Sequence, residues 1–122
     1  MTHKHAIVHV ELPSKDSKAD SNFYKNVFEW NIVTDEEMDY TMFTGEEGDL
    51  GGGFNSVSDD NPVGNVLLYI NTPDLKDTLA KIKANGGEVV LESYEIPTVG
   101  TMATFKDPVG NLLALLEPAG EM

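Results

Sequence analysis

The chain has 122 residues, which is the size of one domain and is long enough to bury a core. It carries 21 acidic and 8 basic residues, for a formal net charge of −13. Such a charge repels phosphate backbones and anionic membranes, so the composition argues against nucleic-acid and membrane partners. All basic residues are lysines and there is no cysteine, which excludes arginine clamps for polyanions, disulfides and thiolate catalysis.

The chain runs from Met1 directly into a predicted strand, without the charged and apolar segments of a secretory leader. No apolar run approaches the length that is needed to cross a membrane. We therefore expect a cytoplasmic protein.

Residues 6–12 are predicted to form the first strand because β-branched residues are frequent in them, and Pro13 is expected to end it. Alternation along a strand divides the side chains between two faces. One face carries an imidazole and a carboxylate, from His9 and Glu11. The other face is apolar and carries Val8, Val10 and Leu12.

A helix is expected over residues 17–29, with Asp16 as its N-cap. Its apolar stripe should cover the apolar face of the first strand. The stripe consists of Ala19, Phe23 and Val27, with Tyr24 and Phe28 beside it. Short strands follow at 30–34, 40–44 and 50–55, and the last contains three glycines that permit close approach of backbone or ligand.

The same pattern repeats after a polar linker at residues 57–64. A strand at 65–71 leads into a helix that Thr72 should cap, with Pro73 at its first position. Gly86 and Gly87 should end this helix. Three further strands are expected at 88–95, 101–105 and 112–117, with a hairpin turn at 107–111 before the last.

Two copies of one unit, each too small to be stable alone, should share a core. We expect a single α+β domain over residues 1–122, with module one at 5–56, the linker at 57–64 and module two at 65–118. The natural ligand site is where the two modules meet.

Four segments follow one another in order across nearly the whole chain: His9-Val10-Glu11-Leu12, a helix with Phe23-Tyr24 and Val27-Phe28, Ala84-Asn85-Gly86-Gly87, and Asp107-Pro108-Val109-Gly110-Asn111. Together they resemble the glyoxalase, bleomycin-resistance and extradiol-dioxygenase superfamily, also called the vicinal oxygen chelate superfamily. The resemblance implies two βαβββ modules that form a half-open barrel, or cup. It also implies a homodimer, as family members often form one.

In metal-dependent members the cup holds one divalent ion, so the resemblance implies four ligand positions. By position these fall on His9, on the glycine-rich stretch at 50–54, and on about Leu67 and Ala114. Of these, His9 matches, whereas Leu67 and Ala114 cannot bind a metal. A cup without a metal cofactor is therefore the leading expectation. The alternative is one Zn, Ni, Fe or Mn ion held by His9 and unusual partners.

His9 and Glu11 are the candidate catalytic residues. Their Cα atoms should lie about 7 Å apart, so both could reach one ion, or they could form a hydrogen-bonded pair in which the carboxylate raises the imidazole pKa. His9 could equally be a half-buried histidine that a neighbour satisfies. His3 and His5 extend the same face towards a frequently frayed terminus, and a chelating series is the weaker interpretation there.

Apolar residues should line the cup and contact the ligand. The candidates are Phe54, Leu67, Tyr69, Ala114 and Leu116. Tyr69 could add a hydroxyl for the ligand, or it could be a core tyrosine.

The sequence thus favours a small-molecule-binding protein with a mostly apolar, metal-independent cup. The alternative is a metal-dependent lyase or isomerase resembling lactoylglutathione lyase, in which Glu11 would move protons. A scaffold whose main role is dimerisation is a third possibility.

Overall fold

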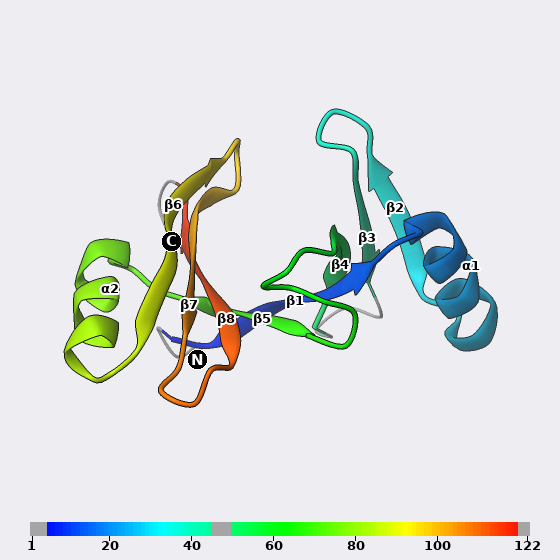
Figure 1. Cartoon of the computed structure of the whole chain (residues 1–122). Coiled ribbons are helices and arrows are strands. Elements are labelled where there is room, and N and C mark those ends of the chain that lie inside the picture. The colour runs from blue at the N-terminus through cyan, green and yellow to red at the C-terminus, as the bar shows by residue number, and fades with distance from the viewer. Residues whose placement is uncertain (1–4, 45–49, 120–122) are drawn as a thin grey trace. The chain divides into compact units, whose positions relative to one another are not determined.

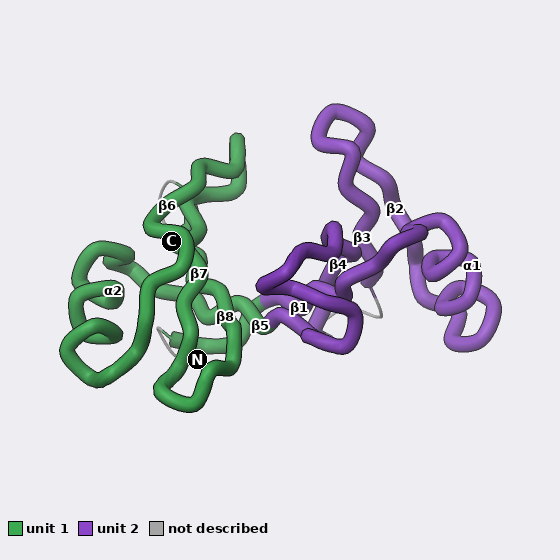
Figure 2. The backbone as a smooth tube through the Cα atoms, in the orientation of Figure 1, with its two compact units in different colours: residues 1–8, 68–122 green, residues 9–67 purple. Residues whose placement is uncertain are grey.

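The computed structural model describes residues 5–44 and 50–119. The chain divides into two compact units, which Figure 2 colours separately. Unit 2 comprises His9–Leu67, and unit 1 comprises Met1–Val8 with Leu68–Met122. Unit 2 therefore holds most of the predicted module one, while unit 1 holds the predicted module two from Leu68 onwards together with the first residues of the chain.

Unit 2 contains a helix and a mixed sheet with the strand order β2-β3-β4-β1. Strand β1 pairs with β4 in parallel, whereas the β2–β3 and β3–β4 pairs are antiparallel. The elements, labelled in Figure 1, are β1 (Ile7–Ser14), α1 (Ser17–Phe28), β2 (Asn31–Asp35), β3 (Tyr40–Thr44) and β4 (Gly52–Ser56).

Unit 1 repeats this arrangement, with the strand order β5-β8-β7-β6. Again the first strand pairs in parallel with the last, here β5 with β8, and the other pairs are antiparallel. The elements are β5 (Leu67–Asn71), α2 (Leu75–Ala84), β6 (Glu88–Ile96), β7 (Gly100–Lys106) and β8 (Leu112–Pro118). The sequence of elements confirms the predicted α+β class and the two βαβββ modules.

Two predicted boundaries were wrong. Pro13 does not end the first strand, because β1 continues to Ser14; proline fits an extended backbone and lacks only the N–H group. Thr72 is not the cap of α2. Asp74 caps it, since its side chain accepts a hydrogen bond from the Asp77 N–H at 3.0 Å, while the Thr72 hydroxyl bonds to Thr78 at 2.8 Å.

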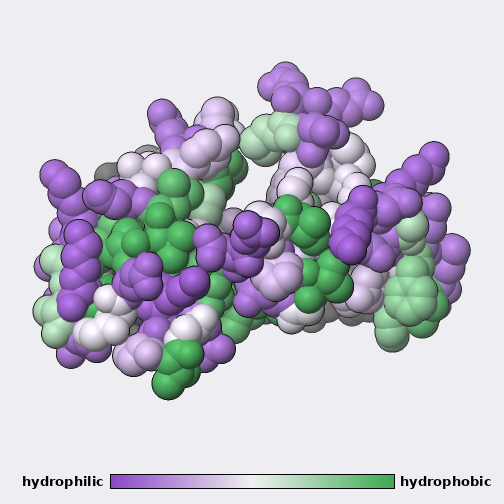
Figure 3. Space-filling view, viewed as in Figure 1, coloured by the Kyte–Doolittle hydropathy of each residue, from purple (hydrophilic) through white to green (hydrophobic). Residues whose placement is uncertain are grey.

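The predicted stripe on α1 was also wrong in its orientation. Phe23, Val27 and Phe28 are each more than half exposed, and Figure 3 shows hydrophobic side chains on the surface over α1. Tyr24 instead makes the contact with the sheet, because its ring stacks on Trp30 at 4.9 Å and lies 6.1 Å from Phe54. The helix is therefore turned so that Tyr24 faces the strands.

The two units have different cores. In unit 2, Trp30 stacks on Phe43 at 4.7 Å between ring centroids, and Phe43 lies 5.4 Å from Phe54, so rings fill the space under α1. In unit 1 the buried cluster is mainly aliphatic and lies under α2. Its members are Leu75, Ala103, Phe105 and Leu115. Among residues 5–44 and 50–119, no helix is long and apolar enough to cross a membrane.

Candidate functional site

Unit 2 contains a chain of hydrogen-bonded polar side chains. Nε2 of His9 lies 2.9 Å from the Tyr40 hydroxyl. That hydroxyl donates to Oε2 of Glu11 at 2.5 Å, and Nδ2 of Asn55 donates to Oε1 of the same carboxylate at 3.2 Å. The predicted pair of His9 and Glu11 is thus bridged by a tyrosine, and His9 has a neighbour that satisfies its ring nitrogen.

The sheet register brings these residues together. His9 and Glu11 lie on one face of β1 by alternation. Glu11 is paired with Gly53 of β4, and Asn55 lies two residues further along that strand, on the same face. Tyr40 begins β3, which is antiparallel to β4 with Met42 opposite Gly53. Three strands therefore each contribute to one cluster.

Gly53 makes room for the tyrosine. A Cβ atom at this position would overlap the hydroxyl oxygen and the adjacent ring carbon of Tyr40. Gly52 has a similar constraint, because a Cβ there would overlap the carbonyl oxygen of Val10 on β1. The glycine-rich stretch is thus explained by close approach, as the sequence suggested, but the group that approaches Gly53 belongs to the protein itself.

The hydrogen bonds determine which atoms carry protons. The hydroxyl of Tyr40 has one proton, and it points to Glu11. The Tyr40 oxygen therefore accepts from His9, which requires the proton of neutral His9 to sit on Nε2. In the same way, Asn55 must present its amide nitrogen to Glu11, which fixes the direction of its carbonyl oxygen.

Burial has the largest effect on the pKa of His9. Desolvation lowers its pKa below the ordinary histidine value, and the nearby Glu11 carboxylate opposes this with a smaller effect. The sequence interpretation included only the carboxylate and therefore expected a raised pKa. The side chain of Glu11 is itself buried, and the hydrogen bonds from Tyr40 and Asn55 offset part of the cost of burying this polar group.

One buried acceptor in the cluster has no hydrogen-bond partner among the described residues. Oδ1 of Asn55 is buried and makes no hydrogen bond within the part of the chain that the structure describes. A buried acceptor of this kind costs free energy unless water or a ligand supplies a donor. Tyr40 and Asn55 were not singled out from the sequence. The signal that could have found Tyr40 is the conjunction of a glycine in β4 with an aromatic residue on the neighbouring strand.

The predicted apolar contacts are divided between faces and units. Phe54 belongs to the aromatic core under α1, and alternation along β4 places it on the face opposite to Gly53 and Asn55. Leu67 is buried at the end of unit 2. In unit 1, Tyr69 is buried beside Ala114, its register partner on β8.

Leu116 lies two residues beyond Ala114 on β8, so the two share a face with Tyr69. The opposite face carries Leu115, which packs in the core under α2. The Tyr69 hydroxyl donates to Sδ of Met102 at 3.8 Å, a weak bond to a sulfur acceptor. The structure thus brings Tyr69, Ala114 and Leu116 together on one side of the unit 1 sheet.

The donor set of the described residues does not fit a divalent ion. Residues 5–44 and 50–119 contain no group of three or more histidines and carboxylates that could hold a metal. Nε2 of His9 is bonded to the Tyr40 hydroxyl, so Nδ1 is the ring nitrogen through which His9 could bind an ion without breaking that bond. Nδ1 of His5 donates to the Asn71 carbonyl at 3.2 Å within unit 1, while His3 lies outside the described residues.

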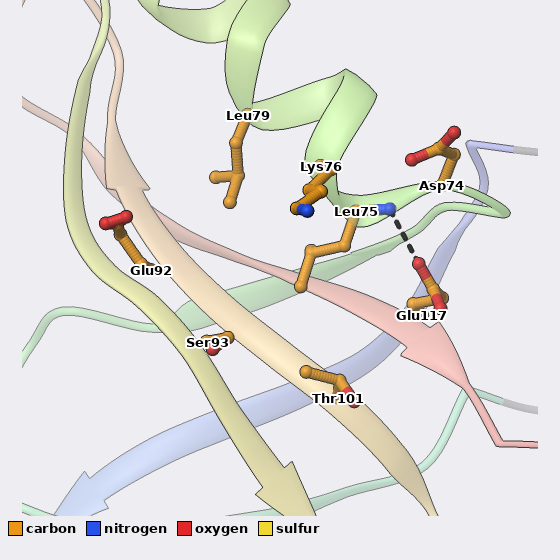
Figure 4. Close-up of a pocket in the computed structure, with 8 residues that line it drawn as sticks. All are labelled: Asp74, Leu75, Lys76, Leu79, Glu92, Ser93, Thr101 and Glu117. Carbon is orange, nitrogen blue, oxygen red and sulfur yellow. Dashed lines mark hydrogen bonds between the residues drawn. The ribbon is translucent and has the colours of Figure 1, made fainter.

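Unit 1 has a cavity of about 380 Å³ between α2 and strands β6 and β7, drawn in Figure 4. Leu75 and Leu79 supply its apolar wall. The Glu117 carboxylate at its edge accepts a hydrogen bond from the Leu75 N–H at 2.7 Å, so this carboxylate stabilises the first turn of α2. The sequence did not predict this cavity; two of its lining residues, Glu92 and Ser93, lie where the pairing of β6 with β7 shifts register.

Comparisons with known proteins agree with this architecture. The family model of the Glyoxalase/Bleomycin resistance protein/Dioxygenase superfamily matches residues 6–115. The chain belongs to this superfamily. A solved structure of methylmalonyl-CoA epimerase from Mycobacterium tuberculosis is similar over 98% of this chain and 94% of that chain, with a TM-score of 0.70 and 15% identity. At this identity the likeness shows a shared glyoxalase fold.

Two curated relatives are similar in sequence. A glyoxylase-like domain-containing protein from Didymella fabae is 28% identical over 120 residues, which cover 92% of this chain and 93% of the relative. The putative glyoxylase CFP32 of Mycobacterium bovis is 40% identical over 52 residues, which cover 43% of this chain. That match spans 20% of the relative's own length.

Proposed function

We propose that this superfamily member binds a small molecule without a metal ion and holds it through the polar cluster of unit 2. The observation that carries the proposal is the buried Glu11 carboxylate, which accepts hydrogen bonds from Tyr40 and Asn55. Among residues 5–44 and 50–119, no group of three or more histidines and carboxylates could hold a metal ion. Leu67, which is buried in the same unit, is an apolar residue proposed to contact this ligand.

The charges of the chain favour a neutral or cationic ligand. Glu11 is an acceptor, and Oδ1 of Asn55, which has no hydrogen-bond partner among the described residues, adds a second one. A ligand that donates hydrogen bonds therefore suits the cluster better than an anion. The net charge of −13 and the lack of arginine weigh against substrates that carry several phosphates or carboxylates. Coenzyme A esters and glutathione adducts are therefore poor candidates.

The test is native mass spectrometry and metal analysis of protein that is purified without a His tag. The proposal expects less than stoichiometric metal and a small organic molecule that stays bound after treatment with EDTA. Glu11→Gln should release this molecule, because the substitution exchanges an acceptor for a donor. One equivalent of Zn, Ni, Fe or Mn per chain, lost in His9→Ala, would refute the proposal.

The alternative function is a metal-dependent lyase or isomerase, which the similarity to glyoxylase-like proteins favours. It requires His9 to bind the ion through Nδ1, or to release Tyr40 and bind it through an unprotonated Nε2, with Glu11 moving protons. Turnover of the hemithioacetal of methylglyoxal and glutathione, dependent on added Zn²⁺ or Ni²⁺ and lost in His9→Ala, would support this alternative.

The homodimer and the cytoplasmic location belong to the same proposal. Light scattering coupled to size-exclusion chromatography tests the first, because a dimer has twice the mass of 13.3 kDa that the sequence gives for one chain.

A further inference from the structure

Two side chains of unit 2 converge on one oxygen atom. Nε2 of His9 approaches the Tyr40 hydroxyl oxygen at 2.9 Å, and Oε2 of Glu11 approaches it at 2.5 Å. An imidazole nitrogen and a carboxylate oxygen are common ligands of divalent transition-metal ions. The point between them is therefore chemically suited to a cation, yet in this protein a phenol occupies it.

The phenol is held there by the backbone. Tyr40 starts β3, and its hydroxyl and ring lie over Gly53, where any other residue would place a Cβ atom into them. Gly53 is in turn the register partner of Glu11, so the strand pairing fixes the hydroxyl against the carboxylate. The position of Tyr40 is thus a consequence of the sheet and of one glycine.

We propose that Tyr40 is a positioning residue that holds His9 as its Nε2–H tautomer. Its hydroxyl occupies the point where His9 and Glu11 converge, and so prevents this pair from binding a divalent cation there. This inference rests on the proposed metal-independent function and gives a structural reason why the cluster binds no metal ion. It also limits how His9 can form hydrogen bonds with a ligand. Since the proton on Nε2 is used internally, neutral His9 can act as an acceptor only through Nδ1.

A direct consequence is a latent cation site. Without the tyrosine, the Nε2 lone pair of the other tautomer and the Glu11 carboxylate would both point into the vacated space, in a chain whose net charge of −13 attracts cations. Two protein ligands make a weak site, so the effect should be visible as a gain over the native protein rather than as tight binding.

The first test is calorimetric titration of Zn²⁺ into the full chain. His3→Gln and His5→Gln are introduced into every variant, so that the N-terminal histidines cannot chelate. Tyr40→Ala should bind Zn²⁺ measurably more tightly than the matched parent, because the imidazole of His9 and the carboxylate of Glu11 can then both reach the ion. Adding His9→Gln to Tyr40→Ala should abolish the gain. Equal affinity of parent and Tyr40→Ala, or a gain that survives without His9, would overturn the proposal.

The second test uses Tyr40→Phe, which keeps the aromatic ring and is the safer variant for folding. Nitrogen-15 NMR of labelled histidine at neutral pH should show His9 of the native protein protonated at Nε2, and a mixture of tautomers in Tyr40→Phe. A native His9 protonated at Nδ1, or a tautomer that Tyr40→Phe leaves unchanged, would overturn the proposal.

These results can be separated from a failure of the proposed function. A protein that retains no small molecule but shows the Nε2–H tautomer and the gain in Zn²⁺ affinity refutes the function and supports the role of Tyr40. A protein that retains a ligand but fails both tests supports the function and refutes the role of Tyr40.

Discussion

Units 1 and 2 use the same scaffold for different interiors. In each, the first strand pairs in parallel with the last, and an aspartate caps the helix, Asp16 in α1 and Asp74 in α2. The faces of the first strands differ. Strand β1 carries His9 and Glu11, which bond to Tyr40, whereas β5 carries Tyr69 in an apolar setting with its hydroxyl on a sulfur atom.

The comparison shows that the same arrangement of strands and helix caps carries different clusters of side chains in the two units. Caps, turns and strand order repeat because they depend on local sequence and on apolar faces that need cover. The polar cluster occurs in unit 2 because Gly53 leaves space for Tyr40, and no equivalent combination is found among the described residues of unit 1. Four comparisons test this contrast.

The largest expected effect concerns the two cores. Phe54→Ala removes a ring that contacts Tyr24 and Phe43 and should lower the free energy of unfolding by about 3–5 kcal/mol. Leu115→Ala in unit 1 is the matched control, with an expected loss of about 2–5 kcal/mol. Urea unfolding followed by circular dichroism measures both, and the fluorescence of Trp30 reports on unit 2. A loss below about 1 kcal/mol for Phe54→Ala would show that the aromatic core is not formed as described.

The next largest loss of stability should come from substituting side chains that form hydrogen bonds on the faces of β1 and β5. Glu11→Ala leaves the donors of Tyr40 and Asn55 without their acceptor and should cost about 1–3 kcal/mol. Tyr69→Phe removes a hydroxyl that donates to the Met102 sulfur and should cost less than about 1 kcal/mol. Thermal or urea unfolding compares the two variants. Equal losses of unfolding free energy in the two variants would contradict the proposed difference between the polar face of β1 and the apolar face of β5.

Much of the fold could be predicted from sequence, because it depends on local signals. The apolar periods, the glycines after α2 and the turn at 107–111 mark elements without reference to the rest of the chain. Alternation along β1 also correctly placed His9 and Glu11 on one face.

The remaining features depend on contacts that are distant in sequence. Tyr40 meets Glu11 across 29 positions, and only the β3–β4 and β1–β4 registers bring them together. The direction of the His9 pKa depends on burial, which a sequence pattern does not measure. The stripe on α1 was misplaced because several aromatic residues at helical spacing left more than one face available to the sheet.

A loss of stability similar to that of Glu11→Ala should follow from substitution of Gly53. Gly53→Ala forces Tyr40 to move and should cost about 1–3 kcal/mol, as overpacked sites do. Gly51→Ala is the control on the same segment, where the nearest atom, the Phe43 carbonyl oxygen, would lie 3.1 Å from the new Cβ. We expect Gly53→Ala to be less stable than Gly51→Ala in thermal unfolding and to alter the NMR signals of His9. The reverse order of stability would show that Gly53 does not provide the space that the Tyr40 side chain occupies.

The smallest effect concerns pH. Burial lowers the His9 pKa in the folded chain, so the unfolded chain binds the proton more readily. The corresponding stability is fully present above the unfolded pKa of about 6.5 and is lost as pH falls towards the lower folded value. Urea unfolding between pH 7.5 and 5.5 should therefore show a decline for the native chain and a shallower one for His9→Gln. Identical slopes would mean that His9 is not held neutral beside Glu11 and Tyr40.

The most direct test of the polar cluster is a crystal structure of the untagged protein grown with excess zinc. Our interpretation predicts that the Tyr40 hydroxyl stays between Nε2 of His9 and the Glu11 carboxylate, with no zinc at that point. A zinc ion bound to His9, with the tyrosine displaced from Gly53, would contradict it.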